Sequence, residues 1–483
     1  MTGKAYTPSF RPTQRPKEVS ELFELADALV RLVRKLGADV AEAVLSEGRH
    51  LSAKVRLGEP ELVEEASSRS IGVRAMIRDG GGGFRVAVSV SSDLTEAGIS
   101  RLAEDVVELA RLAEVDPFAG PPDQALFSSE EYHPELDLFD PSIDSIDARE
   151  AIGSAKAVEK VALGVDPRIN NSEGAEFSRA SGITVLVTSE GFRGWNCGTH
   201  ASLWVAPVAD DQGGKKQSAS AWTSSRHRLG LRSTEEVGKE AAQRTLAKLG
   251  ARKVNTTECP VIFEREAGGS LIGAFAGCVL GGAIWRKSSY LVDRLNTVVA
   301  SPLVTIIDDP LILRGLGSRA FDGEGLLSRR NFIVEEGRLR TYLLDSYSAR
   351  KLGMRSTGSA SRSSSGGVSA STSNFILLPG SMTPEELIAQ TERGFLVTEM
   401  MGFGFNPVTG DFSRGASGFW IEKGRKAFPV SEVTISGNLD QMLQSIDAIA
   451  NDLDLQSSIA APTFRIASMM VAGSGDFSRD IGE

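Results

Sequence analysis

Histidine is scarce in this chain of 483 residues, and none of its four histidines follows position 227. Residues 228–483 therefore contain no imidazole with which to bind zinc or to act as a general base near neutral pH. The four histidines show no metal-ligand spacing, and we expect no functional role for any of them. They are His50, His133, His200 and His227.

Cysteine is also rare. Cys197, Cys259 and Cys278 are too widely spaced for a disulfide framework or a Cys-x-x-Cys metal site. We interpret all three as structural thiols in a reducing compartment.

Long uncharged hydrophobic runs are missing as well. The longest candidate, 267–285, is interrupted by glycines, so no segment is expected to cross a membrane. The first 17 residues are polar and lack the apolar core of a secretory signal. The net charge of −10 gives no electrostatic reason to approach nucleic acid. The sequence therefore predicts a cytoplasmic protein that binds neither membranes nor nucleic acid.

Apolar residues are abundant enough for two or three packed cores, at 41% of the chain. Shifts in composition divide the sequence into six expected segments. These are a loose arm over 1–18, a first α+β domain over 19–115, a linker over 116–147, a second α+β domain over 148–250, a C-terminal domain over 251–475 and a tail over 476–483.

The spacing of apolar residues predicts an α+β fold. Helix and hairpin units come first, and a strand-rich C-terminal domain with a curved or barrel-like sheet follows. The expected helices are 20–36, 94–113, 148–163, 234–249, 269–280, 384–392 and 440–451. The expected N-terminal strands form hairpins over 39–57 and 72–90, followed by separate strands over 169–178, 183–188 and 193–207. Ser-Glu-Gly at 46–48, 172–174 and 189–191 predicts three turns.

The final third of the chain carries a series of motifs in a fixed order. They are Trp-Arg-Lys-Ser-Ser-Tyr-Leu at 285–291, Phe-Asp-Gly-Glu-Gly at 321–325, Ser-Tyr-Ser-Ala-Arg-Lys-Leu-Gly-Met at 346–354, Thr-Gly at 357–358, Thr-Gly-Asp-Phe-Ser-Arg-Gly-Ala at 409–416 and Ile-Ser-Gly-Asn-Leu at 435–439. Together they resemble the TldD/PmbA family, and within it the TldE (PmbA) branch. The two-hairpin N-terminal unit fits that family's layout.

The resemblance implies that this chain has lost a zinc site. In the TldD branch a helix carries His-Glu-x-x-x-His, and a cysteine near the C-terminus completes the metal site. We place the corresponding positions at Ile272, Gly273 and Gly277, none of which can bind zinc or transfer a proton. Residues 456–472 also lack cysteine. The resemblance therefore implies a non-catalytic subunit with no cofactor of its own.

The same resemblance implies a partner and a substrate. A TldD-like zinc protease subunit would supply the metal in a heterodimer that cleaves unfolded peptides, and a chain without that partner is expected to form a homodimer. The family also carries a historical label as a modulator of DNA gyrase. A peptide cleft is expected to involve the small residues of 356–374, which otherwise suit a flexible loop. The candidate cleft residues are Ser348, Lys351, Thr357, Gly358, Ser359 and Arg414.

Two other functions remain open from the residues alone. Ser348 and Lys351 match the Ser-x-x-Lys pattern of serine acyltransferases and would serve an autonomous peptidase, although the companion motifs are absent. An adaptor that binds peptides without a protease partner is the second alternative. An oxygen-ligand metal site is a further, disfavoured interpretation. Its residues would be Asp308, Asp309, Asp322 and Glu324.

Overall fold

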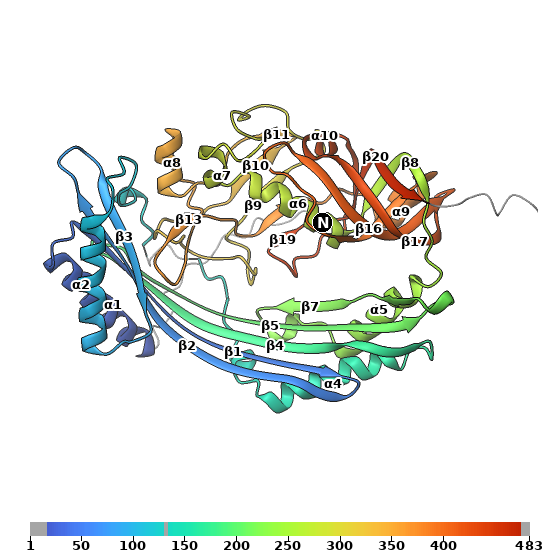
Figure 1. Ribbon diagram of the computed structural model, residues 1–483, viewed down its shortest axis with the longest axis horizontal. Helices are drawn as coiled ribbons and strands as arrows, with labels where there is room; N and C mark the ends of the chain where they lie inside the picture. Colours follow the sequence, from blue (N-terminus) through green and yellow to red (C-terminus); the bar gives the residue numbers. More distant parts are fainter. Residues whose placement is uncertain (1–16, 130–133, 475–483) are drawn as a thin grey trace, which may run out of the picture.

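The computed structural model describes residues 17–129 and 134–474. Most of the expected arm, the whole of the expected tail and His133 lie outside these residues. A long, curved sheet forms the N-terminal half (Figure 1). Its strands lie in the order β3-β2-β1-β4-β5-β6, and β7 also pairs with β5. They are β1 (Val40–Arg56), β2 (Glu59–Arg78), β3 (Phe84–Ser91), β4 (Ile169–Thr188), β5 (Arg193–Asp210), β6 (Lys216–Ser218) and β7 (Ala221–Ser225). The ranges 19–115 and 148–250 thus contribute strands to one sheet.

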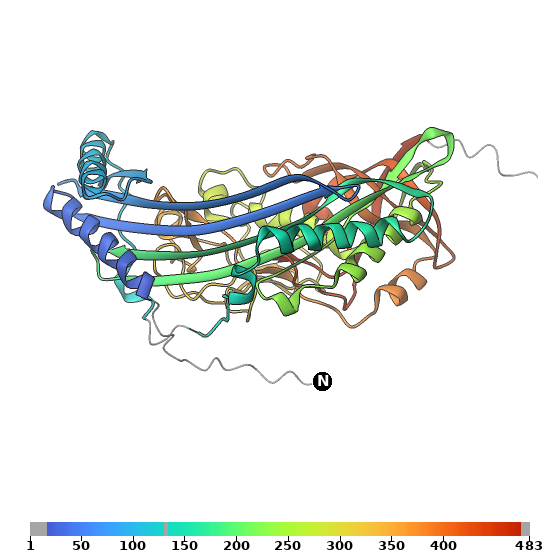
Figure 2. The ribbon, with the colours of Figure 1, turned by 90° about the horizontal axis from the view of Figure 1, so that it is seen from below.

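Four helices cover the convex face of this sheet (Figure 2). They are α1 (Lys17–Lys35), α2 (Glu96–Leu112), α4 (Ala148–Leu163) and α5 (Thr234–Ala247). The first two pack at one end of the strands and the last two at the other, each pair over its own apolar cluster. Local signals fix the helix starts: Asp147 caps α4, and Ser233 forms a capping box with Glu236 in α5. All four helices predicted for this half are confirmed.

The predicted hairpin over 39–57 is wrong, because β1 continues through Ser-Glu-Gly at 46–48. These residues pair with β2 on one side and with β4 on the other, so Gly48 lies opposite both Ser68 and Gly182. The strands predicted at 169–178 and 183–188 are likewise one strand, β4, in which the second Ser-Glu-Gly lies at a bulge. Only the third copy forms a turn, where Gly191 has φ of 102°. The chain reverses instead at Leu57 and Gly58.

The C-terminal half contains two larger sheets and a small hairpin. Strands β17-β16-β15-β8-β20-β18 form the first sheet, and an extra pairing of β17 with β20 closes five of them into a ring of hydrogen bonds. The second sheet has the order β11-β10-β9-β14-β19, and β12 pairs with β13. The predicted strand-rich α+β character is confirmed.

The C-terminal strands are β8 (Asn255–Phe263), β9 (Ile306–Asp308), β10 (Asn331–Glu335), β11 (Arg338–Leu339), β12 (Ala360–Arg362), β13 (Val368–Ala370), β14 (Phe375–Leu377), β15 (Arg393–Met401), β16 (Asp411–Glu422), β17 (Arg425–Asn438), β18 (Ile446–Ile449), β19 (Ile459–Ala460) and β20 (Phe464–Ser474). The helices are α6 (Arg265–Cys278), α7 (Gly281–Trp285), α8 (Ser346–Leu352), α9 (Pro384–Ala389) and α10 (Leu439–Gln444). The helix predicted over 440–451 is only partly correct, because its second half is strand β18, which pairs with β20.

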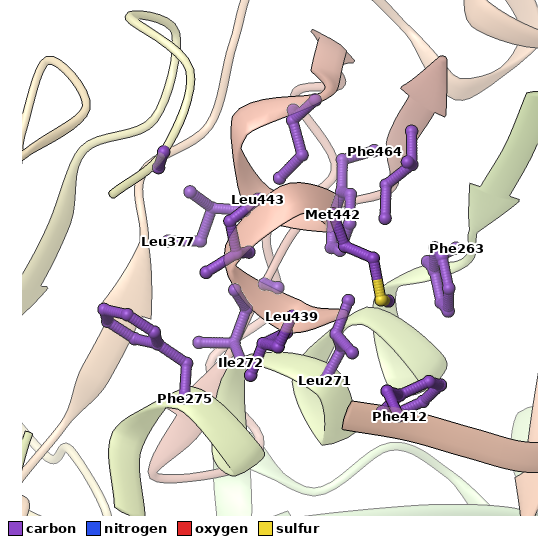
Figure 3. Close-up of a cluster of buried hydrophobic side chains, with 14 of the residues drawn as sticks. Phe263, Leu271, Ile272, Phe275, Leu377, Phe412, Leu439, Met442, Leu443 and Phe464 are labelled. Atoms are coloured by element: carbon purple, nitrogen blue, oxygen red, sulfur yellow. The ribbon is translucent and has the colours of Figure 1, made fainter. Parts of the chain in front are cut away.

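The main C-terminal core lies between α6, α10 and the ring of strands. Figure 3 shows Leu271 and Ile272 of α6 among side chains of α10, including Leu439 and Leu443. All four side chains have no exposed surface. The core therefore holds one face of α6 firmly, and this fixes the direction of its opposite face.

The two halves pack against each other across the concave face of the large sheet (Figure 1). The expected linker contains a short 3₁₀ turn at Gln124–Leu126, next to the C-terminal half, and α3 (Pro141–Asp144), which packs with α4 on the convex side of the sheet. The serine- and glycine-rich segment forms the β12–β13 hairpin, whose tip lies so close to β2 that a Cβ at Gly72 would meet the Ser364 carbonyl oxygen at 2.2 Å. Within the described residues, no helix has the length and apolar character needed to cross a membrane.

Candidate functional site

A cavity of about 530 Å³ lies where α6 faces the end of the large sheet. The N-terminal half contributes Trp222 of β7 and Arg232. The α6 helix contributes its small residues Gly269, Ser270 and Gly273. The segment around β19 completes the wall. The other lining residues are Arg265, Glu266, Asp454, Gln456, Ser457, Ile459, Ala460 and Ala461.

The carboxylates of this cavity already have cationic partners. Glu266 accepts a hydrogen bond of 2.9 Å from Arg244, and Asp454 lies 3.6 Å from Arg265. Arg414 approaches the same part of α6, where its Nη1 donates to the Ser270 hydroxyl at 2.9 Å. Both carboxylates are thus paired with arginines, and small residues leave the space between them open.

Only one of the three expected metal-motif positions faces this cavity. Gly273 lines it, Ile272 has no exposed surface and packs in the core, and Gly277 is exposed with open space around it. A structural zinc ion takes four nitrogen, sulfur or oxygen ligands, and a catalytic one takes three with water. The lining offers neither imidazole nor thiol, so the residues present do not fit zinc. Across 17–129 and 134–474, no three His, Cys, Asp or Glu side chains are grouped as metal ligands.

Two more cavities extend this space along the concave face of the sheet. The next, of about 440 Å³, shares Trp222, Gln456 and Ser457 with the first. It also shares His200 and Arg226 with a third cavity, of about 430 Å³. Because neighbouring cavities share walls, the three adjoin. We call them together the inner groove.

Small and polar side chains of two paired strands form the floor of the third cavity. Ala180, Gly182 and Thr184 of β4 lie opposite residues 200, 198 and 196 of β5. Gly198 has a specific role there, because a Cβ at this position would meet Nη1 of Arg226 at 2.7 Å. Burial, followed by the positive charge of Arg226, lowers the pKa of His200 below its usual value. His200 is therefore a neutral imidazole at pH 7, and its Nε2 lies 2.6 Å from the Ser224 hydroxyl.

Ser348 and Lys351 lie outside the inner groove and have different partners. The Ser348 hydroxyl is buried on α8 and donates to the carboxylate of Asp345, which caps the helix. Lys351 points elsewhere, over the ring of Phe118 at 4.3 Å and toward Asp116 at 4.0 Å. The geometry does not favour the Ser-Lys peptidase alternative, because the amine is occupied away from the hydroxyl.

Three other candidate cleft residues hold a loop in place. The Thr357 hydroxyl accepts the Leu344 amide hydrogen at 2.7 Å and lies 2.8 Å from the Ser359 hydroxyl. Gly358 has φ of 69° and passes close to the Leu327 carbonyl. None of the six candidates lines the groove, and of them only Arg414 is hydrogen-bonded to a lining residue, Ser270.

The predicted carboxylate candidates also anchor loops. Asp322 accepts the amide hydrogens of Glu324, Leu326 and Ala360, while Asp309 pairs with Arg330. Burial, followed by repulsion from Asp322, raises the pKa of Glu324 to about 7. Of these carboxylates, Glu324 lines a separate cavity of about 310 Å³, together with Arg74 of β2.

Family models match the chain in three consecutive parts: PmbA/TldA metallopeptidase domain 1 at 41–110, the central domain at 141–249 and the C-terminal domain at 256–473. The chain is 37% identical over 436 residues to the metalloprotease PmbA of Escherichia coli O157:H7, which covers 90% of this chain and 93% of that protein. The chain belongs to the PmbA/TldD family. This confirms the resemblance seen in the C-terminal motifs.

Other PmbA/TldD relatives agree with this membership. A metalloprotease TldD homologue of Haemophilus influenzae is 30% identical over 224 residues, 46% of each chain. A crystal structure of a candidate modulator of DNA gyrase from Bacteroides thetaiotaomicron covers 94% of this chain and 99% of its own, with a TM-score of 0.85 and 28% identity. TldE from Thermococcus kodakarensis has the same fold, with a TM-score of 0.81 at 21% identity over 93% of this chain and 100% of its own.

Proposed function

We propose that this PmbA/TldD-family chain is the TldE-type, non-catalytic subunit of a metalloprotease that degrades or processes unfolded peptides. The observation that carries the proposal is the inner groove and its wall on α6. The groove lies along strands, as an extended peptide does, and the α6 residues that line it are Arg265, Glu266, Gly269, Ser270 and Gly273. Glu266, the one carboxylate among them, already accepts a hydrogen bond from Arg244, and the other four offer no general base. A TldD-like partner would therefore supply zinc and the general base.

In this proposal the chain binds and orients the substrate. Trp222 offers an aromatic surface at the junction of the first two cavities, and glycines let a peptide backbone come close to α6. Packing of the C-terminal half over the sheet would keep folded proteins out of the groove. An unfolded segment of chain fits because it presents its backbone over a long distance.

The test is to produce this chain alone, a TldD-like partner alone and the two together. Bound zinc and cleavage of an unstructured peptide are then measured for each. We expect zinc in the partner and full cleavage only in the mixture. Chelator-sensitive cleavage by this chain alone, with stoichiometric zinc, would contradict the proposal.

Two variants separate the alternative functions. Ser348→Ala should leave cleavage by the mixture within about twofold of the unaltered pair, since the hydroxyl only donates to Asp345, the residue that caps α8. Gly273→Trp should reduce cleavage because it fills the first cavity, whereas Gly277→Trp, on open surface of the same helix, is the matched control. Peptide binding without any cleavage in the mixture would instead support a peptide-binding adaptor.

A further inference from the structure

We propose that the third cavity of the inner groove is a carboxylate-binding subsite, in which Arg319 receives a carboxylate of the bound peptide. The inference rests on the proposed function, because it assigns part of the groove to one chemical feature of the substrate. Neither the motifs nor the family names single out this cavity.

Arg319 supplies the first argument. It lines the third cavity with Ser318, and its Nε is buried without a hydrogen-bond partner among the described residues. A buried guanidinium N–H that makes no hydrogen bond costs free energy, and a bound acceptor removes that cost. Burial lowers the pKa of Arg319 below its usual range, although a guanidinium stays charged at pH 7.

The acidic neighbours of Arg319 do not take the place of such a ligand. Asp322 and Asp308 act on it only as nearby charges, and no ion pair joins them within the described residues. Asp322 is already hydrogen-bonded to three amide groups, and Asp308 accepts the Ser373 amide hydrogen at 2.6 Å. Burial raises the pKa of both carboxyls.

Arg226 supplies the second argument, because it adds another positive charge to the same cavity. Its side chain donates to the carbonyl oxygens of Thr199, Gly315 and Leu316, so its position is fixed by backbone atoms rather than by a carboxylate. Two arginines therefore face one cavity with no ion pair to either of them among residues 17–129 and 134–474. A ligand with a negative charge suits this arrangement.

The other walls are suited to a small planar anion. Asn196 and Thr184 add an amide and a hydroxyl beside the arginines, and the facing pair Gly182 and Gly198 keeps the floor low. Arginine binds carboxylates through two parallel hydrogen bonds, which fixes their orientation. A peptide carboxylate held here would place the preceding residues along the second cavity toward Trp222 and α6.

The carboxylate can come from the C-terminus of the peptide or from an Asp or Glu side chain. Three fluorescent ten-residue peptides of Gly, Ser and Ala distinguish these sources. The first ends in a free carboxylate, the second in a carboxamide, and the third in a carboxamide with one internal Glu. Binding is measured by fluorescence anisotropy for the full chain, alone and with a TldD-like partner. We expect at least one carboxylate peptide to bind about tenfold more tightly than the neutral peptide.

Arg319→Gln should remove this difference while leaving the neutral peptide unaffected, and Arg319→Lys should retain part of it. Arg101→Gln, at an exposed position of α2, is the matched control for loss of one positive charge. Asn196→Asp places a carboxylate inside the cavity and should weaken only the carboxylate peptides, which keeps the test informative if an Arg319 variant unfolds. Thermal unfolding of each variant shows whether it is still folded.

The outcomes separate this inference from the proposed function. Equal binding of all three peptides, unchanged in Arg319→Gln and Asn196→Asp, would overturn the subsite and leave the peptide-binding subunit standing. Failure of every peptide to bind, with or without the partner, would overturn both.

Discussion

The two faces of the large sheet are built from alternate residues of the same strands, but their chemistry differs. On β4, Phe177 packs among apolar residues beneath α4, whereas its neighbour Ser178 hydrogen-bonds to Ser202 across the concave face at 2.8 Å. Along the middle of the strand, the concave face carries Ala180, Gly182 and Thr184. The convex face therefore stabilises the fold. The concave face buries less apolar area and leaves room for a ligand.

The largest expected effect sharpens this comparison on a single strand. Phe177→Ala removes a ring that is 4% exposed and should lower the free energy of unfolding by about 3–5 kcal/mol. Urea unfolding followed by circular dichroism measures it. Ser178→Ala, one residue away on the other face, should cost only about 1 kcal/mol. Similar losses in the two variants would mean that the faces do not differ in this way.

A somewhat smaller effect is expected where the concave face carries a buried ion pair. Glu42 is 1% exposed and lies 2.7 Å from Arg362 of the β12–β13 hairpin. Although burial raises its pKa, Arg362 and Arg74 hold the pKa of Glu42 below the usual 4.5. Glu42→Gln should cost about 3 kcal/mol at pH 7, because it leaves two buried arginines without a counter-charge.

The Glu42 contribution should also depend on pH. A lowered native pKa gives stability that is present above the unfolded-state pKa and lost as the pH falls through the native one. The difference between wild type and Glu42→Gln should therefore shrink in acid. Glu47→Gln, which breaks an exposed pair with Arg69, is the control and should cost at most about 1 kcal/mol. An equal loss of unfolding free energy in both variants would contradict a stabilising buried ion pair between the two halves.

The smallest effect concerns Glu324, which also lies where the C-terminal half meets the large sheet. Its native pKa of about 7 lies above the usual 4.5, so the folded protein binds a proton that the unfolded chain releases between these values. Stability from this group is complete below pH 4.5 and is lost as the pH rises through 7. Glu324→Gln should flatten the profile and be more stable above pH 7 by roughly 1–3 kcal/mol. Urea unfolding from pH 4 to 8 measures this, and an unchanged slope would refute it.

The sequence predicted the parts of the structure that depend on neighbours along the chain. Helix α4 begins and ends at the residues that its apolar spacing predicts, 148 and 163. Ser-Glu-Gly at 46–48 misled because its turn propensity is weak compared with pairing to strands on both sides, which ties Gly48 to residues 68 and 182. The serine- and glycine-rich segment misled for a related reason. Its order comes from contact with β2, not from its own composition.

The candidate site was harder to predict than the fold. The motifs drew attention to Ser348 and Thr357, which proved to hold α8 and its following loop. Arg319 and Trp222 were missed, because an arginine or a tryptophan outside a motif gives no signal of its own. The alternation of small residues at 180, 182 and 184 was visible, but a small residue that faces a ligand looks the same in sequence as one that packs against a neighbour.

By itself, the sequence determined the α+β class, the apolar stripes that bury the helices, the family and the lack of imidazole after residue 227. These properties depend on residue identity and on short-range spacing. Only the tertiary structure decided that two separate ranges share one sheet, that Ile272 faces the core while Gly273 faces the groove, and that Arg319 and Asn196 line one cavity. Strand pairing and domain packing join residues more than a hundred positions apart, and no local pattern carries that information.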